Sequence, residues 1–122
     1  MYKVMRAARE SKNNLSSTAA KVWVSFPQRI TETSYQRMRK LAFDRSCDVV
    51  VLAREALQRY IARKAYSVRH SYFMKAGEGV KQNYHLSPEM RDRLQQIHRS
   101  TGISLQAILN EAIEAYVEAE ES

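Results

Sequence analysis

Residues 105–117 read LQAILNEAIEAYV, and residues 49–61, 56 positions earlier, read VVVLAREALQRYI. Both stretches place apolar side chains at alternating intervals of three and one, which is the spacing of one face of an α-helix. All of these apolar positions agree when the chain is aligned with itself at this offset, and Ala112 and Tyr116 match identical residues. A repeat of this length indicates a chain built from two similar units.

A second, shorter helix is predicted upstream of each stretch, since Met38 falls on Leu94 at the same offset. In the first unit, Thr33 with Gln36 resembles the capping box that opens a helix. Asp48 stands where the second unit has a serine, just before the longer helix. Each unit is therefore predicted to contain helix, short turn, helix.

The helix boundaries of the second unit follow from ordinary capping chemistry. Ser87 can cap free backbone N–H groups, Pro88 suits the first turn, and Glu89 suits the positive end of the helix dipole. Gly102 can end that helix in a left-handed conformation. Ser104 then caps the helix that begins near residue 105.

A short segment of alternating character precedes each helix pair, at residues 21–26 and 80–86. Alternation of apolar and polar residues predicts a strand with one buried face. The predicted outward side chains are Lys21, Trp23, Ser25, Lys81, Asn83 and His85. Because Phe26-Pro27 aligns with Leu86-Ser87 at an offset of 60, the sequence predicts about one helical turn inserted after Pro27.

Composition limits the classes of protein that are possible. The chain has 122 residues, a mass of 14.2 kDa, 44% hydrophobic and 27% charged residues, and a net charge of +7, which fits a folded, basic domain. Few Gly and Pro exclude a many-turned all-β fold. No apolar run is long enough to span a bilayer or to serve as a signal peptide, and the one cysteine forms no intrachain disulfide. A cytoplasmic setting is expected.

Charge divides the chain into four segments. We expect a basic N-terminal arm at 1–20 (+3), a first unit at 21–61 (+4), a basic linker at 62–79 (+3) and a second unit at 80–122 (−3) with an acidic end. Any surface that binds a polyanion therefore draws mainly on the first two thirds of the chain.

Strand, helix, helix, repeated, resembles the ribbon-helix-helix family of the Arc and MetJ repressors. The resemblance is carried by residues 83–90 (NYHLSPEM) with Leu94, by residues 101–104 (TGIS), and by the helix that follows. It implies a mainly α fold with one short antiparallel two-stranded ribbon. Two units in one chain most resemble the TraY family of F-type conjugation proteins, which carry tandem repeats of this kind.

The resemblance implies that the ribbon enters the major groove of double-stranded DNA. The base contacts it implies are those of Lys21, Trp23, Ser25, Lys81, Asn83 and His85. The phosphate contacts it implies, or that nearby cations suggest, are those of Ser104, Leu105, Val49, Arg29, Arg45, Lys3, Arg6 and Arg9. Trp23 either stacks in the groove or packs under the arm, and Asp48 places a carboxylate beside one expected phosphate.

Two roles follow from the resemblance and share the same residues. One is an accessory relaxosome protein at a conjugative transfer origin, with a relaxase as partner, and the other is a repressor of its own operon. The two units pair either within one chain or between chains on DNA. Because the two strands differ, a non-palindromic site is expected.

The sequence also bears on three other classes of protein. His70, His85 and His98 lack metal-ligand spacing and Cys47 has no evident base, so we expect no enzyme, metal or cofactor. RNA binding by a basic bundle is the second alternative. An antitoxin-like interaction module is the third. For it, the acidic helix face of Glu111, Glu114, Glu118 and Glu121 is either a docking surface or an ordinary solvated face.

Overall fold

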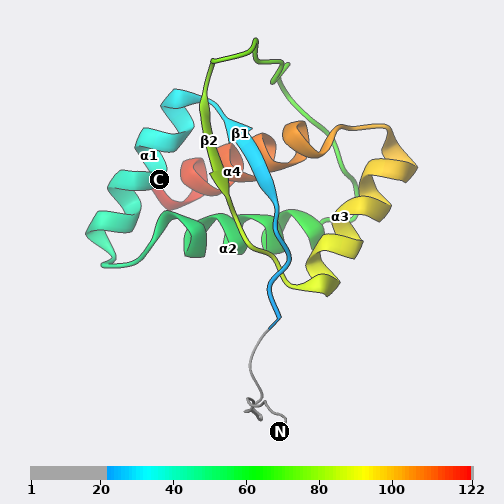
Figure 1. Ribbon diagram of the computed structural model, residues 1–122, viewed down its shortest axis with the longest axis horizontal. Coiled ribbons are helices and arrows are strands. Elements are labelled where there is room, and N and C mark those ends of the chain that lie inside the picture. The colour runs from blue at the N-terminus through cyan, green and yellow to red at the C-terminus, as the bar shows by residue number, and fades with distance from the viewer. Residues whose placement is uncertain (1–21, 122) are drawn as a thin grey trace, which may run out of the picture.

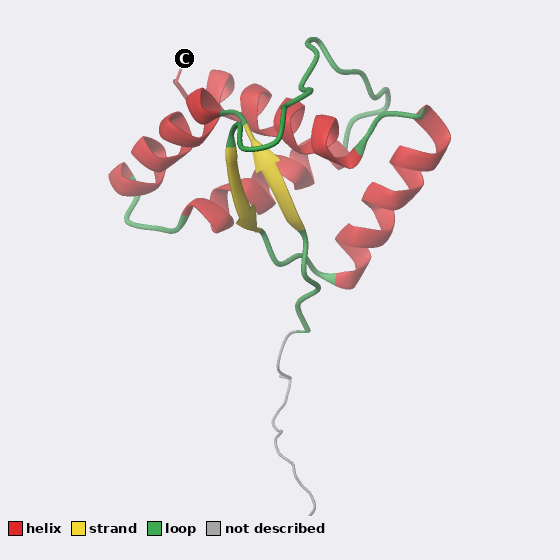
Figure 2. Cartoon of the chain, turned by 45° about the horizontal axis from the view of Figure 1, so that its top comes forward, coloured by secondary structure: helices red, strands yellow, loops and turns green. Residues whose placement is uncertain are grey.

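The computed structural model describes residues 22–121. This part of the chain is mainly helical, with four helices and one two-stranded antiparallel sheet, so the predicted coarse fold is confirmed. The sheet lies across α2 and α4, while α1 and α3 lie on opposite sides of it (Figures 1 and 2). The elements in chain order are β1 (Pro27–Ile30), α1 (Glu32–Asp44), α2 (Val49–Ile61), β2 (Val80–Asn83), α3 (Pro88–Thr101) and α4 (Leu105–Glu121).

The ribbon is symmetric about one pair of residues. Pro27 lies opposite Asn83, and an isolated bridge pairs Val24 with Leu86. Val24 and Leu86 exchange two backbone hydrogen bonds, of 2.6 and 2.8 Å. Because hydrogen-bonded pairs alternate along an antiparallel ribbon, Pro27 takes a non-hydrogen-bonded position, where its missing N–H costs nothing.

This register corrects the sequence prediction. The strand predicted at 21–26 lies further along the chain, and the helical turn predicted after Pro27 does not exist, because those residues are strand. Thr31, not Thr33, caps α1, and its Oγ1 accepts a 3.2 Å hydrogen bond from Ser34 N. Thr31 stands 56 positions before Ser87, so a single offset relates strands, caps and helices.

The predicted caps of the second unit are confirmed. Ser87 Oγ accepts from Met90 N at 3.2 Å, and Ser104 Oγ accepts from Ala107 N at 3.1 Å. Gly102 ends α3 with φ 77°, as expected of a left-handed cap. Its counterpart 56 positions earlier, Ser46, has φ 53°, so the turn is conserved in geometry but not in residue type.

The core lies between the inner face of the ribbon and the helices. Phe26, Ile30, Tyr84 and Leu86 point inward from the ribbon and are buried. They meet the apolar faces of α2 and α4, whose central residues are buried as the repeat predicts. Neither helix pair could bury this surface alone, so the two units form one core.

Residues 62–79 cross α4 before entering β2. Tyr72 is 6% exposed, its hydroxyl hydrogen-bonds the carboxylates of Glu111 (3.0 Å) and Glu114 (2.9 Å), and its carbonyl accepts from Gln106 Nε2 at 2.7 Å. The aromatic residue next to it, Phe73, is 80% exposed. Tyr72 thus attaches the linker to α4 through polar contacts, and Tyr66 packs against the core further upstream.

Gly79 ends the linker at a position that admits no side chain. Its φ is 75°, and a Cβ there would lie 2.6 Å from Ile30 O and 2.5 Å from Met74 Sδ. A glycine is therefore required where the linker passes the end of β1 and the chain turns into β2.

Candidate nucleic-acid interface

The outer face of the ribbon carries polar and cationic side chains. Residues on this face alternate with the buried inner residues, as the pleat requires. They are Pro27 and Arg29 of β1 with Ser25 just before it, and Lys81 and Asn83 of β2 with His85 just after it. The sequence analysis predicted all three residues of the second strand but only Ser25 of the first. The offset of 56 that aligns the helices also aligns Asn83 with Pro27 and His85 with Arg29, so applying it to the strands would have identified both residues.

Of the other two predicted base contacts, Trp23 is described and Lys21 is not. Trp23 stands beyond the paired residues, with its indole ring 4.2 Å from the guanidinium carbon of Arg54 on α2. The ring therefore lies beside α2 in a cation–π contact. Lys21 lies outside the described residues, as do Lys3, Arg6 and Arg9 of the predicted arm.

The two ends of the outer face differ in charge. Arg29 lies opposite Lys81 at one end, where Arg29 Nη1 also donates to Glu78 O at 3.0 Å. Ser25 and His85 occupy the other end, between the Pro27–Asn83 and Val24–Leu86 pairs. One end thus presents two cations, and the other presents a hydroxyl and an imidazole. Arg29, which we expected to contact phosphate, lies on the outer face of the ribbon, opposite Lys81.

Asn83, at the centre, is engaged within the ribbon. Its Nδ2 donates to Ser25 Oγ at 2.8 Å, and its Oδ1 accepts from Phe26 N at 2.8 Å and from His85 N at 3.3 Å. These bonds support the chain where His85 adopts φ 40°. Bidentate pairing with adenine needs the same amide oxygen and nitrogen. The amide therefore holds the ribbon backbone in the free protein.

Two side chains, one from α2 and one from α4, hold the ends of the strands in place. Asn110 is fully buried; its Oδ1 accepts from Thr31 N and its Nδ2 donates to Arg29 O, both at 3.0 Å. Its counterpart 56 positions earlier, Arg54, donates from Nε to His85 O at 3.0 Å. Sequence reasoning missed both residues, because a polar residue at a helix position gives no sign that its partner is a strand carbonyl.

The N-termini of α2 and α4 flank the ribbon on opposite sides (Figure 1). At α4, Ser104 and the free amide groups near Leu105 give a neutral, donor-rich helix start. At α2, Asp48 occupies the cap position before Val49 but makes no side-chain capping bond. The two predicted phosphate sites are therefore unequal, because only the α2 site carries a carboxylate.

Arg45, a predicted phosphate contact, is engaged elsewhere. Its Nη1 donates to Tyr116 OH at 2.9 Å, and its Nη2 forms an ion pair with Glu120. Hydrogen bonding to Glu120 raises the pKa of Arg45. Glu120 also pairs with Arg59 at 3.0 Å, so the carboxylate joins the end of α1 to α2.

The acidic face of α4 is paired within the molecule. Glu111, predicted to face away from the core, is instead 2% exposed and receives Arg69 Nε at 2.6 Å. Arg69 also pairs with Glu118 at 2.8 Å, and Arg37 of α1 pairs with Glu121 at 2.6 Å. Hydrogen bonding to these arginines lowers the pKa values of Glu118 and Glu121. The face is therefore an internal ion-pair network rather than an open acidic surface.

Tyr72 lies beside two of these carboxylates. Burial, together with hydrogen bonds to Glu114 and Glu111, raises the pKa of its phenol well above the usual range. The hydroxyl therefore stays protonated and donates to the glutamates at neutral pH.

Comparison with protein-family models, with curated proteins and with solved structures finds no match. Within residues 22–121, no group of three or more His, Cys, Asp or Glu side chains is arranged to hold a metal ion. No helix of this part of the chain is long and apolar enough to span a membrane.

Proposed function

We propose that the protein is a tandem ribbon-helix-helix protein that binds double-stranded DNA through the outer face of its ribbon. The observation that carries the proposal is the exposed two-stranded ribbon centred on Pro27 and Asn83, which presents Arg29 and Lys81 together at one end. A two-stranded ribbon fits the major groove of B-form DNA, which presents a distinct pattern of donors and acceptors for each base pair.

Arg29 and Lys81 are the residues that read bases in this proposal. Both can donate to O6 and N7 of guanine, and a good bidentate pair contributes about 1–3 kcal/mol of discrimination. Ser25 and His85 face the other half of the site. Since the two ends differ, the site is non-palindromic.

Phosphate binding in this proposal falls mainly to the start of α4. Ser104 and the amide groups near Leu105 supply donors at the positive end of the helix dipole. The corresponding site at Val49 is weaker because Asp48 repels an anion. The intramolecular pairing of the acidic α4 side chains supports this arrangement, because it offsets negative charge that would otherwise repel DNA.

Within this function, the tandem arrangement favours an accessory relaxosome protein at a conjugative transfer origin, acting with a relaxase in the cytoplasm and catalysing no reaction itself. Both units lie in one chain and their strands pair with each other, which supports the likeness to the TraY family. A repressor of the protein's own operon uses the same surface.

The test is fluorescence anisotropy on a selected duplex and a random duplex over a salt series. We expect the selected site to bind at least about 10³-fold more tightly. The Arg29→Ala/Lys81→Ala variant should lose most of that preference. The control is Arg39→Ala/Lys64→Ala, which removes the same charge from exposed positions on α1 and the linker. Equal effects of the two variants, or preference for an RNA duplex, would refute the proposal.

A further inference from the structure

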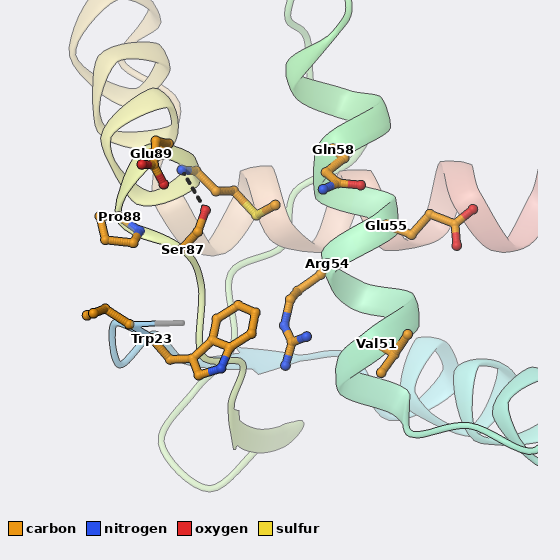
Figure 3. Close-up of a pocket in the computed structure, with 10 residues that line it drawn as sticks. Trp23, Val51, Arg54, Glu55, Gln58, Ser87, Pro88 and Glu89 are labelled. Carbon is orange, nitrogen blue, oxygen red and sulfur yellow. Dashed lines mark hydrogen bonds between the residues drawn. The ribbon is translucent and has the colours of Figure 1, made fainter. Parts of the chain in front are cut away.

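A groove lies on one side of the ribbon, between α2 and the start of α3 (Figure 3). Its volume of about 900 Å³ lies within the range of ligand pockets, so it has room for several side chains. Trp23 and Arg54 form one wall, and Val51, Glu55 and Gln58 line the α2 side. Val22 and Trp23, where the described chain begins, border the groove directly.

The pseudo-symmetric position on the other side of the ribbon is occupied. Adding 56 to the groove residues of α2 gives positions on α4, where Glu55 corresponds to Glu111 and Gln58 to Glu114. Both carboxylates bind the linker: Glu111 receives Arg69, and both accept from the hydroxyl of Tyr72. The site on α4 is therefore occupied by the linker of the same chain.

The segment before the first strand corresponds to the linker before the second strand. The linker ends at Gly79, whose counterpart is Trp23, and the segment that precedes Trp23 is residues 1–22. Lys12 precedes Trp23 by 11 residues, and Arg69 precedes Gly79 by ten. Lys12 therefore lies at nearly the same distance before the first strand as Arg69, which binds Glu111, lies before the second.

Charge also favours this occupant. Glu55 and Glu89 line the groove, and residues 1–20 carry four basic side chains against one acidic side chain. Glu55 is half-exposed and pairs at 2.9 Å with Arg59 on the same helix, a surface contact that contributes little and is easily exchanged. Its buried counterpart Glu111 pairs with the linker instead.

We propose that residues 1–21 bind in this groove in the free protein, with Lys12 paired to Glu55, as the linker binds on the opposite side. The occupant is the chain's own N-terminal segment, so the contact is intramolecular. This inference is independent of DNA binding, because it rests on the internal symmetry of the described chain and on the charge of residues 1–20.

The test is photo-crosslinking of the full chain with p-benzoyl-phenylalanine at Gln58, followed by mass spectrometry of the crosslinked monomer. The matched control places the same group at Gln36, an exposed glutamine on α1 on the other side of the ribbon. We expect crosslinks from position 58 to residues 1–21, at least about fivefold more than from position 36. Glu55→Gln should reduce them by more than half.

Several results would overturn the proposal. Equal yields from the two positions would show that the segment has no preference for the groove. Crosslinks from position 58 that join two chains would assign the groove to a second copy. Because Gln58 and Glu55 are not part of the buried core, circular dichroism of each variant should match the unaltered chain, and the result then reports on the groove alone.

Discussion

The two halves of the molecule share one backbone plan but differ in the side chains at equivalent places. The strand-end clamp is Arg54 in the first half and buried Asn110 in the second, and the second-helix cap is Asp48 in one and Ser104 in the other. Apolar positions that pack the core correspond in the two halves, whereas these polar positions do not. Close packing in one shared core constrains the apolar positions of both halves, whereas polar positions that make local contacts can differ without disturbing it.

The largest expected effect comes from the two strand-end clamps. Asn110→Ala should lower the free energy of unfolding by about 3 kcal/mol, because Thr31 N and Arg29 O are left without their buried partner. Arg54→Ala should cost about 1 kcal/mol or less, since water can replace it at His85 O. Urea denaturation of both variants measures the difference. Equal losses would contradict the distinction between the clamps.

A smaller effect is expected from the two equivalent glutamates. Glu111→Gln should lower the free energy of unfolding by about 2 kcal/mol, because it removes the buried negative charge that pairs with Arg69. Glu55→Gln should lower the free energy of unfolding by less than about 0.5 kcal/mol, since Glu55 is half-exposed and solvent screens both its pair with Arg59 and the proposed pair with Lys12. Thermal unfolding followed by circular dichroism compares them. A Glu55 effect as large as the Glu111 effect would show that the two sites are equally buried in solution.

The turns that join the two helices of each half have equivalent left-handed residues, Ser46 and Gly102, which can each be replaced by the other's residue type. Ser46→Gly should stabilise the first half by about 1 kcal/mol, because a serine at φ 53° is strained and a glycine is not. Gly102→Ser should destabilise the second half by a similar amount. Denaturant midpoints at constant m-value provide the measurement. Changes of the same sign in both variants would refute the argument.

The unequal helix starts make a prediction for DNA binding, which rests on the proposed function. Asp48→Ser should tighten binding about twofold to fivefold, because removing a carboxylate at a helix N-terminus is worth about 0.3–1 kcal/mol toward an anion. The slope of log affinity against log salt should steepen by up to about 0.9 if one phosphate contact is gained. Ser104→Asp should weaken binding on the other side. Anisotropy titrations at three salt concentrations suffice.

The smallest expected effect is on how stability depends on pH under acidic conditions. The pKa values of Glu118, Glu120 and Glu121 are lowered, mainly by hydrogen bonds to arginines. On acidification the unfolded chain therefore binds protons first. The stabilisation is present above the ordinary carboxyl pKa near 4.5 and is lost as the pH falls through the lowered values. Melting temperatures between pH 7 and 3 should fall less steeply for Glu120→Gln. An unchanged slope would show that the pairs are too exposed to matter.

Much of the fold was predictable from local patterns. The faces of α2 and α4, the caps at Ser87 and Ser104 and the left-handed end at Gly102 depend on residues a few positions apart, so periodicity and capping chemistry identify them. The outward positions of Lys81, Asn83 and His85 followed from alternation alone.

The first strand was misplaced because its register is set by a partner 50 or more residues away. Local alternation in residues 21–26 resembled a strand, and alignment of Phe26-Pro27 with Leu86-Ser87 at an offset of 60 placed a helical turn after it. Only pairing with β2 shows that Pro27 lies where no backbone donor is needed, so that the strand continues to Ile30. Arg29 consequently belongs to the outer face.

The sequence by itself determined that the chain is two similar strand-helix-helix units with a basic excess in the first two thirds, because these are properties of spacing and composition. The tertiary structure alone decided which charges remain available. Arg45, Arg37 and Arg69 are paired with glutamates of α4, whereas Arg29 and Lys81 face outward together. Ion pairs between distant segments depend on how the helices pack, and no local pattern records that packing.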